Sequence, residues 1–269
     1  MTNENVATSE SQTKINSVIK SLRILELFNP VNTEYSLTQI SKRLQIPKST
    51  LLNFMRTLEG EGYICRNPIS QNYRLGIKLM ILGYNMRSTL TISHYAIPCM
   101  EDLCAQSKGN VYLTTYVDGI LLYLEGIYSN RRTTKYSVAG KTLPMHVTAS
   151  GKAIMSYMPA GQVDAIIRKH PLIASTKYTI TDPDELRREI RRCHDQGYAF
   201  DNQEETLGIH CVAVAIRDPS GFPVGALSIS GSSMQMTDER RESFVSMLTE
   251  ARATLSDYTS MFPCCPPAN

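Results

Sequence analysis

The N-terminal part of the chain contains a helical pattern that leaves few choices of fold. Apolar residues in 15–28 recur at the 3.6-residue period of an amphipathic helix. Ser36 and Gln39 then have the spacing of a capping box at the start of a short second helix. After a tight connection, Pro47 suits the first position of a third helix, which we expect over about 47–61. A helix, a short helix, a tight turn and a longer helix are the parts of a helix-turn-helix.

Two short strands are predicted directly after the third helix. They cover Tyr63–Arg66 and Tyr73–Leu75, and an Asn/Pro/Ser/Gln-rich turn joins them. With this hairpin, the N-terminal part of the chain, here called the head (residues 14–75), is predicted to be a winged helix-turn-helix. In such a domain the hairpin, or wing, rests on the DNA backbone or minor groove. The charge agrees, because residues 1–88 hold 11 Lys/Arg against 6 Asp/Glu, whereas residues 89–269 hold 17 against 19. We therefore expect the basic head to bind double-stranded DNA.

The polar face of the third helix supplies the candidate base contacts. At 100° per residue the apolar side chains gather on one side and the hydrogen-bonding side chains on the other. Arg can bond guanine and Asn can bond adenine, whereas Ser, Thr and Lys suit phosphate oxygens. Any solvated helix can carry such a face, so the assignment depends on the surrounding helix-turn-helix pattern. The candidate DNA-binding residues are Ser36, Thr38, Lys48, Ser49, Thr50, Asn53, Arg56, Thr57, Arg66 and Arg74.

The rest of the chain is predicted to form a linker helix and an α+β domain. Residues 76–88 carry apolar side chains at helical spacing, which makes this stripe a candidate seam between two copies of the chain. Asp118 and Gly119 predict a hairpin turn between two strands. Strands first and last, with helices between them, indicate a mainly antiparallel sheet. We expect helices at 94–106, 149–157, 162–170, 182–196 and around 244–255, and strands at 110–117, 120–126, 133–138, 210–217 and 224–230.

Composition and spacing argue against several classes of protein. No stretch is apolar enough to cross a bilayer and the polar start lacks the regions of a signal peptide, so we expect a cytoplasmic protein with no membrane partner. The seven cysteines include no CxxC pair and the five histidines form no HExxH pair, so we expect reduced thiols, no metal and no cofactor. A phosphate loop needs a glycine five positions before its Gly-Lys pair. The pairs at 151–152 and 140–141 have His146 and Lys135 at that position, so neither pair fits a phosphate loop.

A cluster of chemically active residue types lies near the C-terminal end. Asp201, His210, Cys211, Ser228 and Ser230 are the residue types of a nucleophilic hydrolase. However, adjacent residues of a strand point to opposite faces, so His210 and Cys211 cannot form a nucleophile and base pair. The two serines are two residues apart and share a face. With Cys211 and Asp201 beside them they could line a pocket for a small polar ligand, or they could be solvated serines beside a core cysteine.

Several segments resemble one family, the IclR-type bacterial transcriptional regulators. In the head these are "SVIKSLRILELF", "LTQISKRLQIPKSTLLNFMRTLEGEGYI" and "YRLGIKLMILG". In the rest of the chain they are "LPMHVTASGKA", "TITDPDELRREI", "GYAFDNQEETLGIHCVAVAIRD" and "GALSISG". The resemblance implies a homo-oligomer, a dimer or a dimer of dimers, that binds a palindromic operator. It also implies a GAF-like effector-binding domain, in which the matching positions of Ala149, Ser150, Asp201, Cys211, Ser228 and Ser230 contribute to the pocket.

Two further residues are candidates on physical grounds. Gly151 follows Ala149 and Ser150 near the start of a predicted helix, where free N–H groups and the helix dipole attract an anion. Small side chains there could equally serve tight packing. Lys135, on the preceding predicted strand, could add a positive charge, although a solvated edge lysine is as good an explanation.

Together these features predict a DNA-binding regulator, with repressor the commoner expectation in the family. Its effector is expected to be a small organic acid or sugar acid. The alternatives are a Cys- or Ser-dependent enzyme with a DNA-binding head, and an architectural DNA binder without a ligand. The expected division is a disordered tail at 1–13, a winged helix-turn-helix at 14–75, a linker helix at 76–90, an effector-binding domain at 91–260 and a flexible tail at 261–269.

Overall fold

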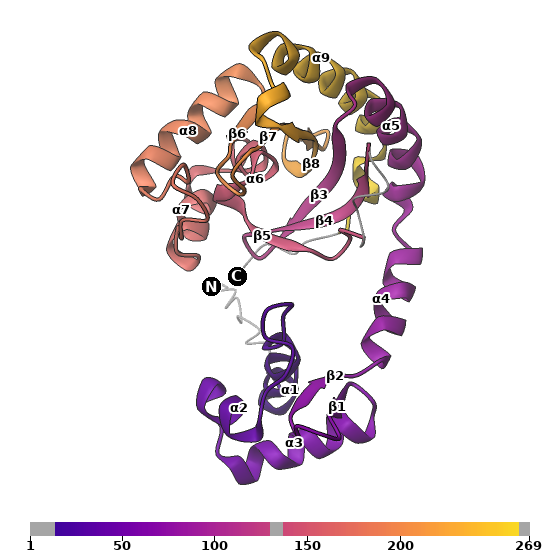
Figure 1. The fold of residues 1–269 in the computed structure, drawn as a ribbon, viewed down its shortest axis with the longest axis vertical. Coiled ribbons are helices and arrows are strands. Elements are labelled where there is room, and N and C mark those ends of the chain that lie inside the picture. The colour runs from indigo at the N-terminus through magenta and orange to yellow at the C-terminus, as the bar shows by residue number, and fades with distance from the viewer. Residues whose placement is uncertain (1–13, 130–136, 264–269) are drawn as a thin grey trace, which may run out of the picture. The chain divides into compact units, whose positions relative to one another are not determined.

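The computed structural model describes residues 14–129 and 137–263. The chain divides into two compact units, residues 1–89 and 90–269 (Figure 1). The tail expected at 1–13 lies outside the described residues, and so do Lys135 and residues 264–269 of the tail expected at 261–269. Met261 ends the 3-10 helix Ser256–Met261, and Phe262 is buried in the core of the second unit, so the folded part of the chain extends past the boundary expected at 260.

The first unit is a winged helix-turn-helix followed by a helix. Its elements are α1 (Asn16–Glu26), α2 (Leu37–Leu44), α3 (Lys48–Gly60), β1 (Ile64–Arg66), β2 (Tyr73–Leu75) and α4 (Lys78–Ser88). The core packs α1, α2 and α3 against the hairpin through Ile24, Ile40, Leu51, Met55 and Ile64, all of which are buried. The three-helix and hairpin order predicted from the sequence is confirmed.

Local signals place the helix ends of this unit. Ser36 and Gln39 form the predicted capping box on α2, with the Gln39 N–H 3.3 Å from the Ser36 hydroxyl and the Ser36 N–H 2.8 Å from the Gln39 amide oxygen. Gln45 adopts the left-handed conformation (φ 55°) that turns the chain between α2 and α3. Pro47 is the N-cap of α3 and not its first helical residue, because its ψ of 138° is extended.

The second unit is an α+β domain around one antiparallel sheet. Within the described residues the six strands are hydrogen-bonded in the order β5-β4-β3-β8-β7-β6, and every neighbouring pair is antiparallel. The strands are β3 (Asn110–Val117), β4 (Ile120–Ile127), β5 (Thr142–Pro144), β6 (Ala199–Asn202), β7 (Ile209–Arg217) and β8 (Pro223–Ser232). The helices are α5 (Thr91–Ser107), α6 (Ala149–Met155), α7 (Ala160–Lys169), α8 (Pro183–Gln196) and α9 (Asp238–Leu255).

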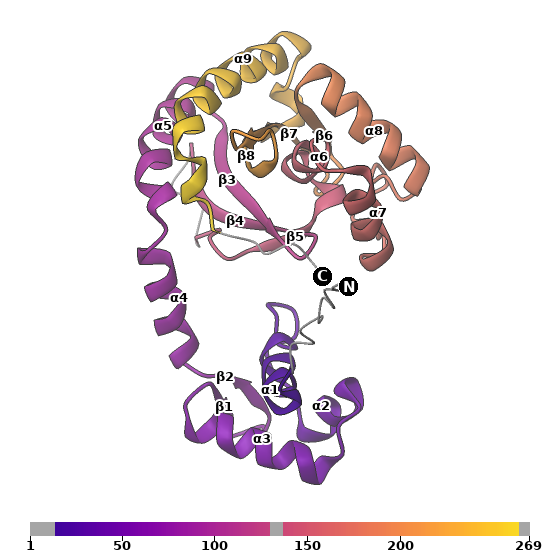
Figure 2. The same cartoon turned by 180° about the vertical axis from the view of Figure 1, so that it is seen from behind.

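Helices cover the two faces of the sheet differently. One face packs against α5 and α9 through large aliphatic and aromatic side chains, including Leu113, Val212, Ile229 and Phe244. The other face packs against α6 through small side chains, including Ala153 and several strand alanines, with α7 and α8 on the same side (Figures 1 and 2). On β7 and β8, the alternation thus supplies one bulky face and one face of small residues.

The details of the sheet show which predictions succeeded. Asp118 and Gly119 both have positive φ, 55° and 80°, as the predicted two-residue hairpin turn requires. The predicted strand at 133–138 falls mostly outside the described residues, and Ser137 and Val138 are not in a strand. The short strands β5 and β6 were not predicted, because three or four residues carry too little alternation.

The described residues contain neither a candidate membrane span nor a candidate metal site. None of their helices is long and apolar enough to span a membrane, and no group of three His, Cys, Asp or Glu among them could hold a metal ion. The described cysteines, which are Cys65, Cys99, Cys104, Cys193 and Cys211, are free thiols.

Candidate functional site

The third helix presents the predicted polar face to solvent. Its other side is buried through Leu51, Met55 and Leu58, and this packing fixes which side chains point outward. Thr38 on α2 is exposed as well. The exposed candidates on α3 are Lys48, Ser49, Thr50, Asn53, Arg56 and Thr57.

Two of the predicted DNA contacts already have structural roles. The Ser36 hydroxyl belongs to the capping box of α2, and the Thr57 hydroxyl donates to the Asn53 carbonyl at 3.0 Å. These intramolecular hydrogen bonds account for the presence of both hydroxyl side chains without any contact to DNA. Asn53 and Arg56 stand apart, because both side chains are exposed on the outer face of α3 and suit base edges.

The two arginines of the wing, Arg66 and Arg74, differ in the contacts that their side chains make within the protein. Arg66 donates from Nη2 to the Tyr73 hydroxyl at 2.7 Å, and its guanidinium lies 4.9 Å from the centre of that ring. Arg74 lies on the neighbouring strand, exposed, with Nε 3.2 Å from the Cys65 sulfur. Arg74 is therefore the freer of the two for a phosphate contact.

In the second unit, the strand register brings four predicted residues onto one face of the sheet. Asp201 on β6 is opposite Cys211 on β7, and Cys211 is opposite Ser230 on β8. Ser228 lies two residues before Ser230 on the same face, opposite Tyr112 of β3. Asp201, Ser228 and Ser230 are all buried. Four residues spread over thirty positions of the sequence thus form one polar strip.

His210 lies on the opposite face of β7, as strand alternation requires. Its ring is 5.0 Å from the ring of Phe200, edge to face, and burial together with the Arg241 charge lowers its pKa. Both ring nitrogens are buried without a hydrogen-bond partner among the described residues. The prediction that His210 and Cys211 cannot act as a pair is confirmed.

Burial determines the protonation of the strip. Burial, followed by the nearby Asp201 charge, raises the pKa of the Cys211 thiol far above its usual value. The thiol therefore stays protonated, which does not suit a nucleophile. Burial also raises the pKa of Asp201 to about 7, although the Glu204 N–H donates to its carboxylate at 2.6 Å and opposes the shift.

The start of α6 borders the same face. Thr148 caps this helix by accepting the Gly151 N–H at 3.0 Å. Packing accounts for the small residues here: a Cβ on Gly151 would lie 2.1 Å from the Met145 carbonyl oxygen. Ala149 is fully buried against the alanines of the sheet. Ser150 is buried too. Ala149 and Ser150 are the first two residues of α6, and N–H groups at these positions have no partner within the helix itself.

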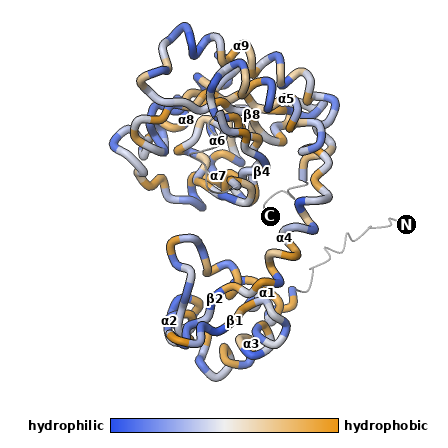
Figure 3. Tube along the Cα trace, turned by 45° about the vertical axis from the view of Figure 1, so that its right-hand side comes forward, coloured by the Kyte–Doolittle hydropathy of each residue, from blue (hydrophilic) through white to orange (hydrophobic). Residues whose placement is uncertain are grey.

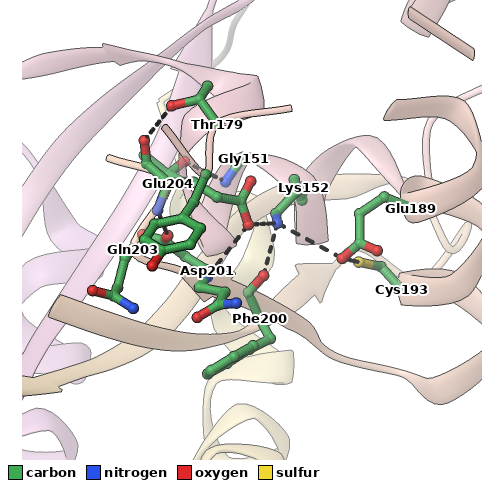
Figure 4. Close-up of polar contacts among 12 residues, drawn as sticks. Gly151, Lys152, Thr179, Glu189, Cys193, Phe200, Asp201, Gln203 and Glu204 are labelled. Carbon is green, nitrogen blue, oxygen red and sulfur yellow. Dashed lines mark hydrogen bonds and ion pairs between the residues drawn. The ribbon is translucent and has the colours of Figure 1, made fainter. Parts of the chain in front are cut away.

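A buried lysine beside this helix start was not predicted as part of the site. Lys152 has no exposed surface. Its Nζ donates to the Phe200 carbonyl at 2.7 Å and to Glu204 Oε1 at 2.5 Å, and it lies 3.7 Å from Glu189 Oε1 (Figure 4). Sequence reasoning tested the Gly151-Lys152 pair only as a phosphate loop. No periodicity or spacing marks a lysine that will be buried.

Tyrosines that sequence reasoning also missed border the strip. The rings of Tyr112 and Tyr123 meet edge to face with centroids 5.4 Å apart, and Tyr128 lies 5.9 Å from Tyr112. Burial, and then neighbouring groups including the Cys211 thiol, raises the pKa of Tyr112 and Tyr123. The Nζ atom of Lys141 lies 5.7 Å from the centre of the Tyr123 ring. The face combines hydroxyls, a carboxyl and aromatic surface, the usual lining of a small-molecule site.

Comparison with known proteins shows similarity over nearly the whole chain. The family model described as the IclR helix-turn-helix domain matches residues 17–68, and that of the bacterial transcriptional regulator IclR C-terminal matches residues 85–257. The HTH-type transcriptional regulator XynR of Escherichia coli is 32% identical over 247 residues, which are 90% of this chain and 96% of that protein.

Solved structures agree with this similarity. An IclR transcriptional regulator from Alicyclobacillus acidocaldarius has a TM-score of 0.76 at 25% identity, covering 91% of this chain and 99% of that one. An IclR homologue from Microbacterium hydrocarbonoxydans, in complex with 4-hydroxybenzoate, has a TM-score of 0.70 at 23% identity, covering 91% and 99%. At this identity the second structure supports the fold alone.

Proposed function

The chain belongs to the IclR family of bacterial transcriptional regulators, and from this premise we propose that a small hydroxylated carboxylate or sugar acid controls its binding to a palindromic operator. It is a DNA-binding regulator, and the relatives it matches are regulators and not enzymes. The expected sign of control is repression, with the effector releasing the operator. Its DNA target places its action in the cytoplasm.

The observation that carries the effector proposal is the polar strip of Asp201, Cys211, Ser228 and Ser230. A carboxyl and two hydroxyls on one buried face can accept and donate hydrogen bonds to the hydroxyls of a ligand. The N–H groups of Ala149 and Ser150, in the first turn of α6, can supply donors for its carboxylate. The Microbacterium homologue binds 4-hydroxybenzoate, an acid with one hydroxyl, which agrees with this class of ligand.

The alternative of a Cys- or Ser-dependent enzyme has little support from the geometry. The pKa of the Cys211 thiol is raised, and His210 points away from Cys211 and from both serines. A nucleophile needs a base within hydrogen-bond reach, and among the described residues no histidine forms a hydrogen bond with Cys211, Ser228 or Ser230.

Two exposed apolar surfaces support the proposed homo-oligomer. Ile15, which precedes α1, and Val18 and Leu22 on α1 are at least half exposed. On α4, Met80 and Tyr84 are about three-quarters exposed. Figure 3 shows hydrophobic residues along α4. Exposed apolar faces of this extent mark association surfaces. A dimer would pair two heads on the two halves of a palindrome.

Control by an effector requires that the ligand bind the DNA-competent and DNA-incompetent arrangements with different affinity. The test is a titration of the upstream intergenic DNA at fixed salt, with and without a panel of hydroxylated, aromatic and sugar acids. We expect one class of acid to shift the midpoint in the wild type. Ser230→Ala should reduce the response while leaving the acid-free midpoint unchanged, and Arg56→Ala should change that midpoint.

Two outcomes would contradict the proposal. If no acid shifted DNA binding or raised the melting temperature, the architectural alternative would hold. If Cys211→Ala abolished a turnover of any panel acid, the enzyme alternative would hold.

A further inference from the structure

The wing of the first unit is tied to the helical core by one acidic residue. Glu34 lies between α1 and α2, next to Tyr35, in a unit whose charge is otherwise strongly basic. Tyr35 forms a bridge with Tyr73 of β2: each N–H donates to the other carbonyl, at 3.0 and 2.8 Å. Both tyrosines are buried. Glu34 is therefore fixed at the edge of the hairpin by a neighbour that belongs to the core.

Both carboxylate oxygens of Glu34 accept hydrogen bonds from the wing turn. Asn67 donates from Nδ2 to Oε1 at 2.6 Å, and Ser70 donates from its hydroxyl to Oε2 at 2.8 Å. Bonds to an ionised acceptor are the stronger kind. The same two bonds lower the pKa of Glu34, so the carboxylate stays charged at neutral pH.

Asn67 passes this restraint on to the tip of the turn. Its Oδ1 accepts the N–H of Ile69 at 2.9 Å and the N–H of Ser70 at 3.3 Å, which is the pattern of an Asx turn. These bonds restrain the turn, and the turn presents Ile69 with 92% of its surface exposed. A β-branched apolar residue held at the tip of a DNA-binding hairpin is placed as minor-groove wedges are, since those are commonly aliphatic side chains.

We propose that Glu34 is a positioning residue that clamps the wing, and that the clamped wing places Ile69 against the minor groove beside the operator half-site. The proposal concerns the DNA-binding function of the chain and does not depend on the effector site.

The clamp and simple electrostatics predict opposite effects for the loss of Glu34. If the residue acted only through its charge, removing it would reduce phosphate repulsion and tighten binding to every DNA. If it acts as a clamp, removing it frees the wing, and the ordering of the wing then opposes specific binding. Glu59 on α3 is a matched control, because it is an exposed carboxylate of the same unit with no partner in the described part of the chain.

The experiment compares full-length wild type, Glu34→Ala and Glu59→Ala by fluorescence anisotropy. The probes are a footprinted fragment of the upstream DNA and a random duplex of equal length, at one salt concentration. We expect Glu34→Ala to weaken specific binding about tenfold while random binding stays equal or becomes tighter. Glu59→Ala should leave the ratio of the two affinities unchanged. Glu34→Ala tightening both duplexes as Glu59→Ala does would overturn the clamp.

A second variant tests the tip. Ile69→Ser should remove hydroxyl-radical protection of the minor groove flanking the half-site, while protection over the major-groove contacts of α3 remains. Because both changes act through the same contact, the double variant should bind no more weakly than Glu34→Ala alone. Unchanged flanking protection in Ile69→Ser would overturn the assignment of Ile69, and additive losses would overturn the link between the two residues. Equal melting temperatures of the variants serve as the folding control.

Discussion

The first and second units place their candidate functional side chains in opposite environments. In the first, Lys48, Asn53 and Arg56 are exposed on one face of α3, and none of them holds the unit together. In the second, Asp201, Ser228 and the supporting Lys152 are buried within the domain. DNA is too large to enter the protein, so it is contacted by side chains exposed on the surface. A small ligand is enclosed by side chains that also belong to the packed interior of the domain. Function and stability should therefore separate in the first unit and be coupled in the second.

The largest expected effect is the loss of the buried cation. Lys152→Ala leaves the Glu204 carboxylate, held at 2.5 Å in the native protein, buried without a counter-charge. Such a change typically costs about 3–5 kcal/mol. Lys141→Ala removes a lysine that is 49% exposed and 3.6 Å from Glu205, so it should cost under about 1 kcal/mol. Urea denaturation measures both, and equal costs would show that the Lys152 network contributes little.

The next effect is a pH dependence from Asp201. Its pKa is raised from 3.8 to about 7, so between these values the native state holds a proton that the unfolded chain releases. The contribution to stability is fully present below about pH 4 and is lost as the pH rises through about 7. Asp201→Asn cannot titrate, so its free energy of unfolding lacks this decrease with pH. The difference in free energy of unfolding, variant minus wild type, should therefore rise between pH 4 and pH 8, by about 4 kcal/mol at most.

Asp218→Asn is the control for that measurement. Asp218 has a lowered pKa, chiefly through the Ser220 hydroxyl, so its contribution is lost as the pH falls and its sign is opposite. The measurement is the midpoint of urea denaturation at pH 4, 6 and 8 for wild type, Asp201→Asn and Asp218→Asn. Parallel curves for wild type and Asp201→Asn would contradict the buried protonated carboxyl.

A smaller effect is expected at the start of α6. Gly151→Ala forces a Cβ to 2.1 Å from the Met145 carbonyl oxygen, and overpacking of this kind costs about 1–3 kcal/mol. Gly161→Ala on α7 places the same methyl group where nothing lies within 4 Å, so it should stabilise the protein by a few tenths to about 1 kcal/mol. Melting temperatures should move in opposite directions. If both rose, the close approach at Gly151 would be wrong.

The smallest effect on stability, and the sharpest separation, is expected in the first unit. Arg56→Ala and Asn53→Ala should each change the free energy of unfolding by less than about 0.5 kcal/mol, because both side chains are exposed. Each should weaken specific DNA binding by about 1–3 kcal/mol if it contacts a base. A melting curve and an anisotropy titration on the same samples test this, and a loss of stability equal to the loss of binding would break the comparison.

Sequence patterns predicted the first unit almost completely because its signals are local. The capping box of α2, the turn after it and the polar face of α3 each depend on residues within about one helical turn of one another. The same holds for the Asp118-Gly119 hairpin and for the N-cap of α8, where the Asp182 carboxylate accepts the Glu185 N–H at 2.7 Å. What local signals did not show is that the fold itself uses Arg66, whose guanidinium donates to the Tyr73 hydroxyl.

In the second unit, the sequence by itself determined which residues share a strand face, since the period of two separates His210 from Cys211 and unites Ser228 with Ser230. Only the tertiary structure decided which strands are neighbours, and so that Asp201, Cys211 and Ser230 form one row. Only the tertiary structure decided that Lys152 is buried among carboxylates and that Glu34 binds a turn more than thirty residues away. Hydrogen bonds and desolvation depend on distances in space, and residues distant in sequence reach them only when the whole chain packs.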